Sequence, residues 1–186
     1  MNSISHNLGM SISQIYFGTT NAGKLKEASN ILGIEVLGCG LDIEEIQSLD
    51  PIKVAVQKAR DYYAKLQKPV LVEDVSLSFL ALNGIPGPYI NDFLKALGNQ
   101  GLIDLLADKS DRRAIAQTTL VYDEHVFIGK IEGTIAPELA GDNGFGWDPI
   151  FIPDGYDKTY AEMKDDGKNQ CSMRALAFAE LKIHLK

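Results

Sequence analysis

Ile15-Tyr16-Phe17-Gly18-Thr19-Thr20-Asn21-Ala22-Gly23-Lys24 joins a short apolar run to a helical pattern through a turn that contains glycine. Apolar residues then recur at helical spacing at Leu25, Ala28 and Leu32. A turn of this kind exposes backbone N–H groups at the helix N-terminus, and the lysine adds a positive charge. The stretch therefore predicts a strand, a turn and a helix that together bind phosphate oxygens.

The same stretch has the spacing of the first seven positions of a P-loop, with Gly18 followed by Gly23 and Lys24. The eighth position of a P-loop is Ser or Thr, because its hydroxyl binds the magnesium ion that bridges the terminal phosphates. Leu25 occupies that position here and cannot bind a metal. A P-loop kinase or NTPase is therefore a weaker alternative, and an ordinary strand-to-helix turn is another.

The composition is that of an acidic protein of moderate size. Its 186 residues are 45% hydrophobic, enough for a well-packed core, and carry a formal net charge of −7. Nucleic acids and membrane surfaces need a broad basic face, so neither is an expected partner. Residues 1–14 are predicted to be a flexible extension and residues 15–186 a single domain. Two distant cysteines without metal-ligand spacing favour reduced thiols and a cytoplasmic location.

Two central segments predict a helix followed by a buried strand. Apolar residues repeat at helical spacing from Ile52 to Leu66, after an Asp-Pro pair typical of a helix start. Lys58 lies on the polar flank of this helix, either in solvent or as a phosphate ligand. The run Val70-Leu71-Val72 predicts a strand that ends at Glu73-Asp74, and the ends of such strands are where open α/β sheets bind ligands.

The remaining segments predict further helices and a hairpin. Helices are expected over residues 91–97 and 102–106, and an antiparallel hairpin over residues 115–122 and 126–135. Ser172 is a suitable N-cap for a last helix. The fold class is therefore α/β, with a mixed sheet and flanking helices.

Four carboxylates, Glu44, Glu45, Glu73 and Asp74, fall at predicted loop or strand ends. Hard oxygen ligands suit Mg²⁺, which usually keeps several waters and is shared with substrate phosphates. A nucleotide with Mg²⁺ accounts for both the carboxylates and the lysine turn. The alternative is that these residues are ordinary surface acids of an acidic protein.

Phe145 and Trp147 lie among glycines, where their rings can stack on a nucleobase. The alternative is a buried lid over a second core. Asp148 is well placed to contact the edge of a base. Further donors for a base or a phosphate are Lys168, Ser172 and Arg174.

The three histidines have no companion Ser or Cys signature. His6 lies in the N-terminal tail, His125 in a predicted turn and His184 in the last predicted helix. None of them is assigned a catalytic role.

Seven short motifs run in order along nearly the whole chain after residue 14, and together they resemble the inosine triphosphate pyrophosphatase family. The motifs are Thr19-Thr20-Asn21-Ala22-Gly23-Lys24, Asp42 to Gln47, Leu71-Val72-Glu73-Asp74, Gly84-Ile85-Pro86-Gly87-Pro88-Tyr89, Phe145-Gly146-Trp147-Asp148-Pro149-Ile150-Phe151, Thr159-Tyr160-Ala161-Glu162-Met163, and Lys168-Asn169 with Ser172 and Arg174.

This resemblance implies an elongated α/β fold, in which a long mixed sheet joins two lobes around a nucleotide cleft, and a homodimer. It also implies Mg²⁺-dependent hydrolysis between the α and β phosphates, which yields a nucleoside monophosphate and pyrophosphate. The implied substrates are deaminated purine nucleotides such as ITP, dITP and XTP, so the activity cleanses the nucleotide pool.

By position, the resemblance also implies roles for individual residues. It implies that the phosphate end of the substrate is bound by Thr19, Asn21, Lys24 and Lys58. It implies that Glu45 and Asp74 bind magnesium and that Asp74, with Glu73, activates the attacking water. It implies that the base stacks on Phe145 and Trp147. The edge of the base is then contacted by Asp148, Lys168, Ser172 and Arg174.

One departure from the family pattern concerns base selectivity. The family commonly has His between the Ser and the Arg of the last motif, and this chain has Met173 there. A thioether is a weak acceptor and cannot donate, so a contact to the 6-keto oxygen is lost or comes from Arg174. We expect hydrolysis with a reduced preference for 6-keto purines. A nucleotide-binding sensor without turnover is the non-enzymatic alternative.

Overall fold

The computed structural model describes residues 12–186, without the side chains of residues 165 and 166. Most of the predicted extension, residues 1–14, lies outside the described residues. Its last residue, Gln14, already belongs to the first strand.

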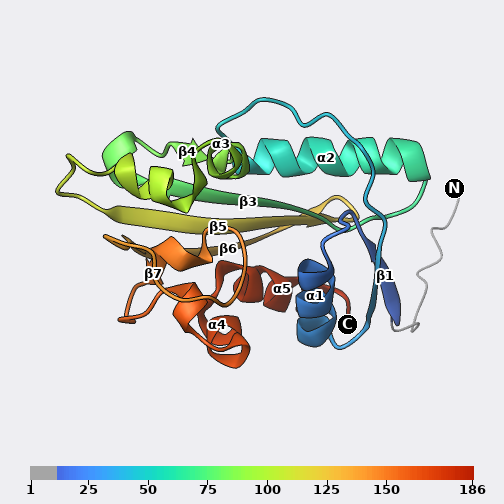
Figure 1. Ribbon diagram of the computed structural model, residues 1–186. Coiled ribbons are helices and arrows are strands. Elements are labelled where there is room, and N and C mark those ends of the chain that lie inside the picture. Colours follow the sequence, from blue (N-terminus) through green and yellow to red (C-terminus); the bar gives the residue numbers. More distant parts are fainter. Residues whose placement is uncertain (1–11) are drawn as a thin grey trace, which may run out of the picture.

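A five-stranded antiparallel sheet forms the centre of the molecule, with the order β4-β3-β5-β6-β7 (Figure 1). A parallel pair, β1 and β2, lies at one end and meets the segment before β3 through a parallel bridge between Phe17 and Leu71. Parallel and antiparallel pairings therefore both occur, as the sequence predicted. The strands are β1 Gln14–Phe17, β2 Glu35–Gly38, β3 Val72–Phe79, β4 Pro86–Gly87, β5 Arg113–Tyr122, β6 His125–Ile135 and β7 Phe151–Pro153.

Helices cover both faces of this sheet (Figure 1). The helices α2 and α3 lie on one face, and α1, α4 and α5 lie on the other. They are α1 Ala22–Leu32, α2 Pro51–Leu66, α3 Ile90–Asp104, α4 Asp165–Cys171 and α5 Met173–His184, with short 3-10 helices at Leu80–Leu82, Asp148–Ile150 and Tyr160–Glu162. Within the described residues, no helix combines the length and apolarity needed to cross a bilayer.

Local capping explains why the predicted helices form. Asp50 accepts hydrogen bonds from the N–H groups of Ile52 and Lys53 and so caps α2. The two helices predicted over residues 91–97 and 102–106 are the two halves of α3, which meet at Gly98 with φ 68°. The sequence did not predict α4, the short helix just before α5 in which Lys168 lies.

The predicted end of the central strand was wrong. The strand β3 continues past Glu73 and Asp74 to Phe79, because it pairs along its whole length with β5. Apolar residues at alternate positions, Val75, Leu77 and Phe79, keep one face of this extension in the core. The two carboxylates therefore lie near the start of β3, and as neighbours in a strand they project to opposite faces of the sheet.

The start of α5 lies unusually close to β6. A Cβ atom at Gly129 would stand 1.8 Å from the carbonyl oxygen of Met173, so only glycine allows this approach. Ser172 caps the helix there, as predicted, by accepting a hydrogen bond from the N–H of Ala175. The first turn of α5, which carries Arg174, is thereby fixed against the sheet.

Candidate functional site

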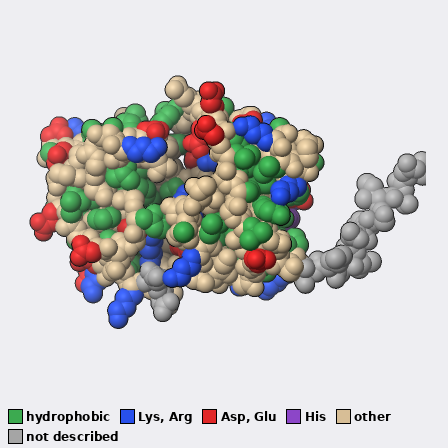
Figure 2. Space-filling view, turned by 45° about the vertical axis from the view of Figure 1, so that its right-hand side comes forward, with side chains coloured by type: hydrophobic (Ala, Val, Ile, Leu, Met, Phe, Trp, Pro, Cys, Tyr) green, Lys and Arg blue, Asp and Glu red, His purple; other side chains and the backbone are tan. Residues whose placement is uncertain are grey.

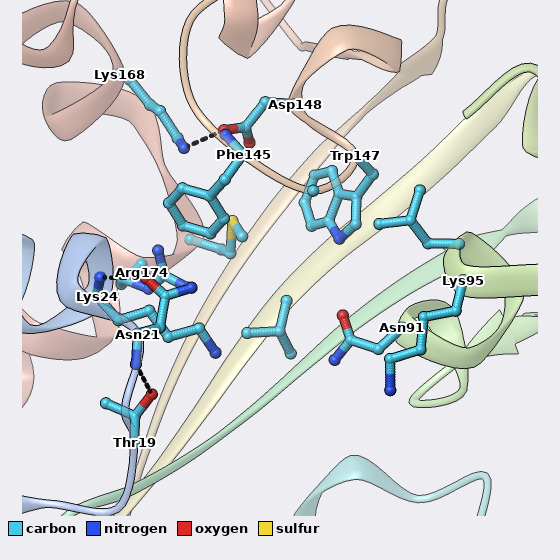
Figure 3. A pocket seen from close by; sticks show the side chains of 14 residues that line it. Thr19, Asn21, Lys24, Asn91, Lys95, Phe145, Trp147, Asp148, Lys168 and Arg174 are labelled. Atoms are coloured by element: carbon cyan, nitrogen blue, oxygen red, sulfur yellow. Dashed lines mark hydrogen bonds and ion pairs between the residues drawn. The ribbon is translucent and has the colours of Figure 1, made fainter. Parts of the chain in front are cut away.

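A cavity of about 400 Å³ opens between the start of α1, the start of α3, the glycine-rich loop before β7, and the helices α4 and α5. Figure 3 shows its walls, and Figure 2 shows acidic and basic side chains close together around a hollow in the surface. Its lining residues are Thr19, Asn21, Lys24, Val75, Asn91, Leu94, Lys95, Phe145, Gly146, Trp147, Asp148, Lys168, Met173 and Arg174.

The predicted strand, turn and helix form one wall of the cavity. Asn21 is the N-cap of α1, and its Oδ1 accepts hydrogen bonds from Gly23 N at 2.9 Å and Lys24 N at 3.2 Å. The hydroxyl of Thr19 accepts a hydrogen bond from the N–H of Asn21 at 3.1 Å. In Figure 3, Thr19, Asn21 and Lys24 lie on one side of the cavity, opposite α3. This wall presents a helix N-terminus and an ammonium group, which suits an anion.

Glu73 is the centre of a buried network of charges. Its carboxylate accepts hydrogen bonds from Arg174 Nε at 2.6 Å and Nη2 at 3.3 Å, and Lys24 Nζ lies 2.7 Å from its Oε2. Arg174 Nη1 also donates to Glu27 at 2.7 Å. Burial by itself raises the pKa of Glu73, but Arg174 and Lys24 outweigh it and lower that pKa to about 2. Glu73 is therefore a permanently charged anchor for two cations.

Asp74, on the opposite face of β3, has different surroundings. Its Oδ2 atom is buried and has no hydrogen-bond partner among the described residues. Burial raises the pKa of Asp74 to about 7, with Lys58 lowering it and the charges of Glu45 and Glu73 raising it. Lys58 forms an ion pair with Glu45 and lies 3.4 Å from the carbonyl oxygen of Glu73. The pKa values of these adjacent carboxylates thus differ because their partners differ.

The predicted magnesium ligands form a pair rather than a closed cage. Within the described part of the chain, no three or more His, Cys, Asp or Glu side chains are grouped to hold a metal ion. Glu45 and Asp74 are close enough for the charge of one to raise the pKa of the other. One or two carboxylates are what Mg²⁺ typically takes from a protein when substrate phosphates and waters complete its shell. The unpartnered oxygen of Asp74 fits that role.

A second wall combines an exposed aromatic ring with a buried ion pair. The side chain of Phe145 is 38% exposed, with Lys168 Nζ 4.6 Å and Arg174 Cζ 5.1 Å from its ring centroid. Asp148 Oδ2 lies 2.6 Å from Lys168 Nζ and accepts the N–H of Phe145 at 2.7 Å. In Figure 3 these side chains gather above the cavity. The ion pair therefore fixes the loop so that Phe145 stands over the opening.

Other predicted residues occupy supporting positions. Trp147 is only 5% exposed and packs edge-on against Phe151, with 5.6 Å between the ring centroids, so it lines the cavity as part of the core. Ser172 is buried and uses its hydroxyl as the helix cap. Lys58 and Glu45 lie beyond the cavity lining, together with the carboxylates of β3.

The structure adds residues that the sequence did not single out. Asn91 and Lys95 lie one turn apart on α3 and line the cavity on the side opposite α1 (Figure 3). Their spacing of four residues was visible in the sequence, but nothing local showed which helix face meets the cavity. Glu27, the second partner of Arg174, was equally hidden, because its partner comes from the last helix.

The amino-acid sequence is similar to those of known proteins along nearly the whole chain. The Ham1 family profile matches residues 15–184. An inosine triphosphate pyrophosphatase from Yarrowia lipolytica is 46% identical over 180 residues, covering 92% of this chain and 95% of the relative. A protein of the same name from Batrachochytrium dendrobatidis is 43% identical, covering 90% of this chain and 92% of the relative. Another from Kluyveromyces lactis is 41% identical, covering 92% of this chain and 95% of the relative.

Solved structures with the same arrangement are also similar. A Ham1 protein from Coxiella burnetii matches with a TM-score of 0.81 and 31% identity, covering 94% of this chain and 98% of the other. The Staphylococcus aureus Ham1 protein matches with a TM-score of 0.78 and 31% identity, covering 92% and 97%. The α/β fold predicted from the sequence is thereby confirmed, and the chain belongs to the Ham1 family.

Proposed function

We propose that this chain hydrolyses deaminated purine nucleoside triphosphates, such as ITP, dITP and XTP, to a nucleoside monophosphate and pyrophosphate. The names of its relatives, inosine triphosphate pyrophosphatases, support this activity. A structure described as a dITP/XTP pyrophosphatase from Mycobacterium abscessus is 30% identical, with a TM-score of 0.70, covering 90% of this chain and 98% of the other. The observation that carries the proposal is a cationic helix N-terminus and an exposed aromatic ring in one cavity, beside two buried carboxylates with different partners.

The triphosphate end of the substrate lies at the start of α1. The N–H groups of Asn21, Gly23 and Lys24 are already bonded to Thr19 and Asn21. The side chains of Thr19 and Asn21 therefore donate to the phosphates through the hydroxyl and the amide NH₂, and Lys24 provides charge. Lys24 is already paired with Glu73, so it is held in place before the substrate binds. Lys58 is held in the same way by Glu45, on the other face of β3. Pre-positioned cations lose little entropy when they bind phosphate.

Asp74 and Glu45 would hold Mg²⁺, and Asp74 would take the proton of the attacking water. When bound, Mg²⁺ draws electron density from the phosphate oxygens and neutralises the charge of the leaving pyrophosphate. Asp74 has a buried oxygen without a partner among the described residues, which can accept a proton, and in the absence of metal burial raises its pKa to about 7. Glu73 has neither, since two cations occupy its carboxylate, and it acts as the positioning residue for Lys24 and Arg174.

The purine lies against Phe145, and its edge faces Asp148 and Lys168. Stacking on the ring accepts any base, so selectivity depends on the polar groups at the edge. Arg174 is committed to Glu73 and Glu27, which leaves it little freedom to donate to a 6-keto oxygen. Met173 lines the cavity and cannot donate at all. Trp147 and Ser172 support this end through packing and capping.

We include in the proposal a homodimer, a cytoplasmic location and a single domain over residues 15–186. The homodimer follows from the family resemblance, and light scattering coupled to size-exclusion chromatography measures it. A mass of one chain at micromolar concentration would contradict it.

Chromatography of the products from ITP and Mg²⁺ tests the proposed reaction. We expect IMP and pyrophosphate in equal amounts. IDP and phosphate would instead support the P-loop type of chemistry, and bound ITP without any product would support a sensor.

A further inference from the structure

Two histidines that the proposed function does not use lie side by side on the surface. His125 is the first residue of β6 and His184 the last residue of α5, and both side chains are exposed. Their ring centroids are 4.3 Å apart, with an angle of 43° between the ring planes. They lie at the end of α5 opposite to Arg174, away from the nucleotide cavity.

A hydrogen bond orients the first ring and sets its tautomer. His125 Nδ1 lies 2.7 Å from the carbonyl oxygen of Asp123. A carbonyl oxygen only accepts, so Nδ1 carries the proton and the neutral ring keeps its lone pair on Nε2. A backbone carbonyl behind one ring nitrogen is the usual support of a metal-binding histidine, because it fixes the ring and increases its basicity.

The spacing of the rings suits two ligands of one ion. Metal–nitrogen bonds of about 2.0–2.1 Å at tetrahedral or square-planar angles place two imidazole centroids roughly 4.5–5 Å apart. The observed centroid separation of 4.3 Å is close to that range, and rotation of the exposed side chains can turn both Nε2 atoms toward one ion.

The elements that carry the rings are firmly connected. The ring of Phe127 packs at 5.3 Å from that of His184, and the N–H of Ile128 donates to Glu180 on α5 at 3.4 Å. At the other end of the helix, Gly129 lies against Met173. The two histidines are thus presented by rigid elements, which lowers the entropy lost when both bind one ion.

We propose that His125 and His184 form a second metal site, specific for a divalent transition-metal ion such as Cu²⁺, Ni²⁺ or Zn²⁺. Imidazole suits these ions, and Mg²⁺ prefers oxygen ligands, so this site and the carboxylate pair select different metals. No group of three or more potential ligands occurs in the described chain, so water completes the shell and the ion exchanges readily. A bound ion joins the start of β6 to the end of α5.

Thermal unfolding of the full chain in excess Mg²⁺, with and without Ni²⁺, tests this site. An ion that binds only the folded chain raises its melting temperature, so we expect Ni²⁺ to raise Tm by a few degrees. His125→Asn and His184→Asn should each abolish the rise. Cys39→Ser and His6→Asn, which remove other transition-metal ligands, should leave it unchanged. No rise in the unmodified protein, or an equal rise in the double histidine variant, would overturn the proposal.

Calorimetric titration with Ni²⁺ is a second measurement that does not depend on melting. We expect one ion per chain, and binding at least ten-fold weaker in each single variant. Equal binding by the double variant would overturn the site. Hydrolysis of ITP with Mg²⁺ should be the same in all these variants, so failure of the metal site and failure of the proposed function are distinguishable.

Discussion

At the scale of single residues, Glu73 and Asp74 show how one strand gives adjacent carboxylates different surroundings. Both are buried, but Glu73 faces Arg174 and Lys24, and Asp74 keeps an oxygen without a partner among the described residues. Their pKa values of about 2 and about 7 follow from that difference. Only the second carboxyl group can exchange a proton near neutral pH.

Replacing Asp74 with Asn tests this assignment. Because an amide cannot take the proton of the attacking water, we expect kcat for ITP to fall by at least about 100-fold. Asp108→Asn, at an exposed residue paired with Lys109, is the matched control and should hydrolyse ITP at the original rate. Steady-state kinetics measures both, and an unchanged kcat in Asp74→Asn would remove this residue from the mechanism.

Replacing Met173 with His tests the origin of base selectivity. An imidazole at this position in the cavity lining can donate to a 6-keto oxygen, and one such hydrogen bond is worth about 1 kcal/mol. We therefore expect the ratio of kcat/KM for ITP over ATP to rise about five-fold. Met173→Leu, which adds no donor, should leave the ratio as it is. Equal ratios in all three proteins would show that selectivity arises elsewhere.

At the scale of helices and strands, the contact of α5 with β6 fixes the position of Arg174. A methyl group at Gly129 would collide with the carbonyl of Met173, so we expect Gly129→Ala to destabilise the protein by about 1–3 kcal/mol. In α4, a Cβ at Gly167 would meet only Met163 Cβ, at 4.0 Å, so Gly167→Ala is the control and should cost nothing. Urea unfolding measures both, and equal stability would contradict the close contact.

Elements with local signals were predictable from the sequence. The helix α2 was confirmed because its Asp-Pro start and its apolar spacing are both contained in one segment. The extent of β3 was not predictable, because Glu73 and Asp74 look like a polar end until their partners are known. Those partners are Lys24, Lys58 and Arg174, which lie on three different helices, α1, α2 and α5.

The candidate site shows the same limit. Glycines around Phe145 and Trp147 indicated an aromatic loop, but only packing against Phe151 shows that Trp147 belongs to the core. Residue types and motif order predicted which side chains would gather, and the contacts of each one became visible only in three dimensions.

At the scale of the whole molecule, the elevated pKa of Asp74 links stability to pH. Asp74 has a pKa of about 7 when folded against 3.8 in its ordinary state, so the folded chain holds the proton more tightly. Below about pH 4 Asp74 is protonated in both the folded and the unfolded chain, and its raised pKa contributes fully to stability. As pH rises from 4 to 7, the unfolded chain loses this proton before the folded chain does, so the free energy of unfolding decreases.

In metal-free buffer, Asp74→Asn should therefore gain stability relative to the original protein as pH rises from 4 to 8. Urea unfolding of both proteins across this range measures the difference. A difference that does not change with pH would show that Asp74 titrates normally.

The central claim is that the molecule places its reaction between the α and β phosphates of a bound nucleotide. Two inosine triphosphate analogues, each with one bridging oxygen replaced by methylene, test it most directly with the unmodified protein and Mg²⁺. We predict that the β,γ-methylene analogue yields IMP and methylenediphosphonate and that the α,β-methylene analogue is inert. Cleavage of the α,β-methylene analogue to release phosphate, with the β,γ-methylene analogue inert, would contradict the account.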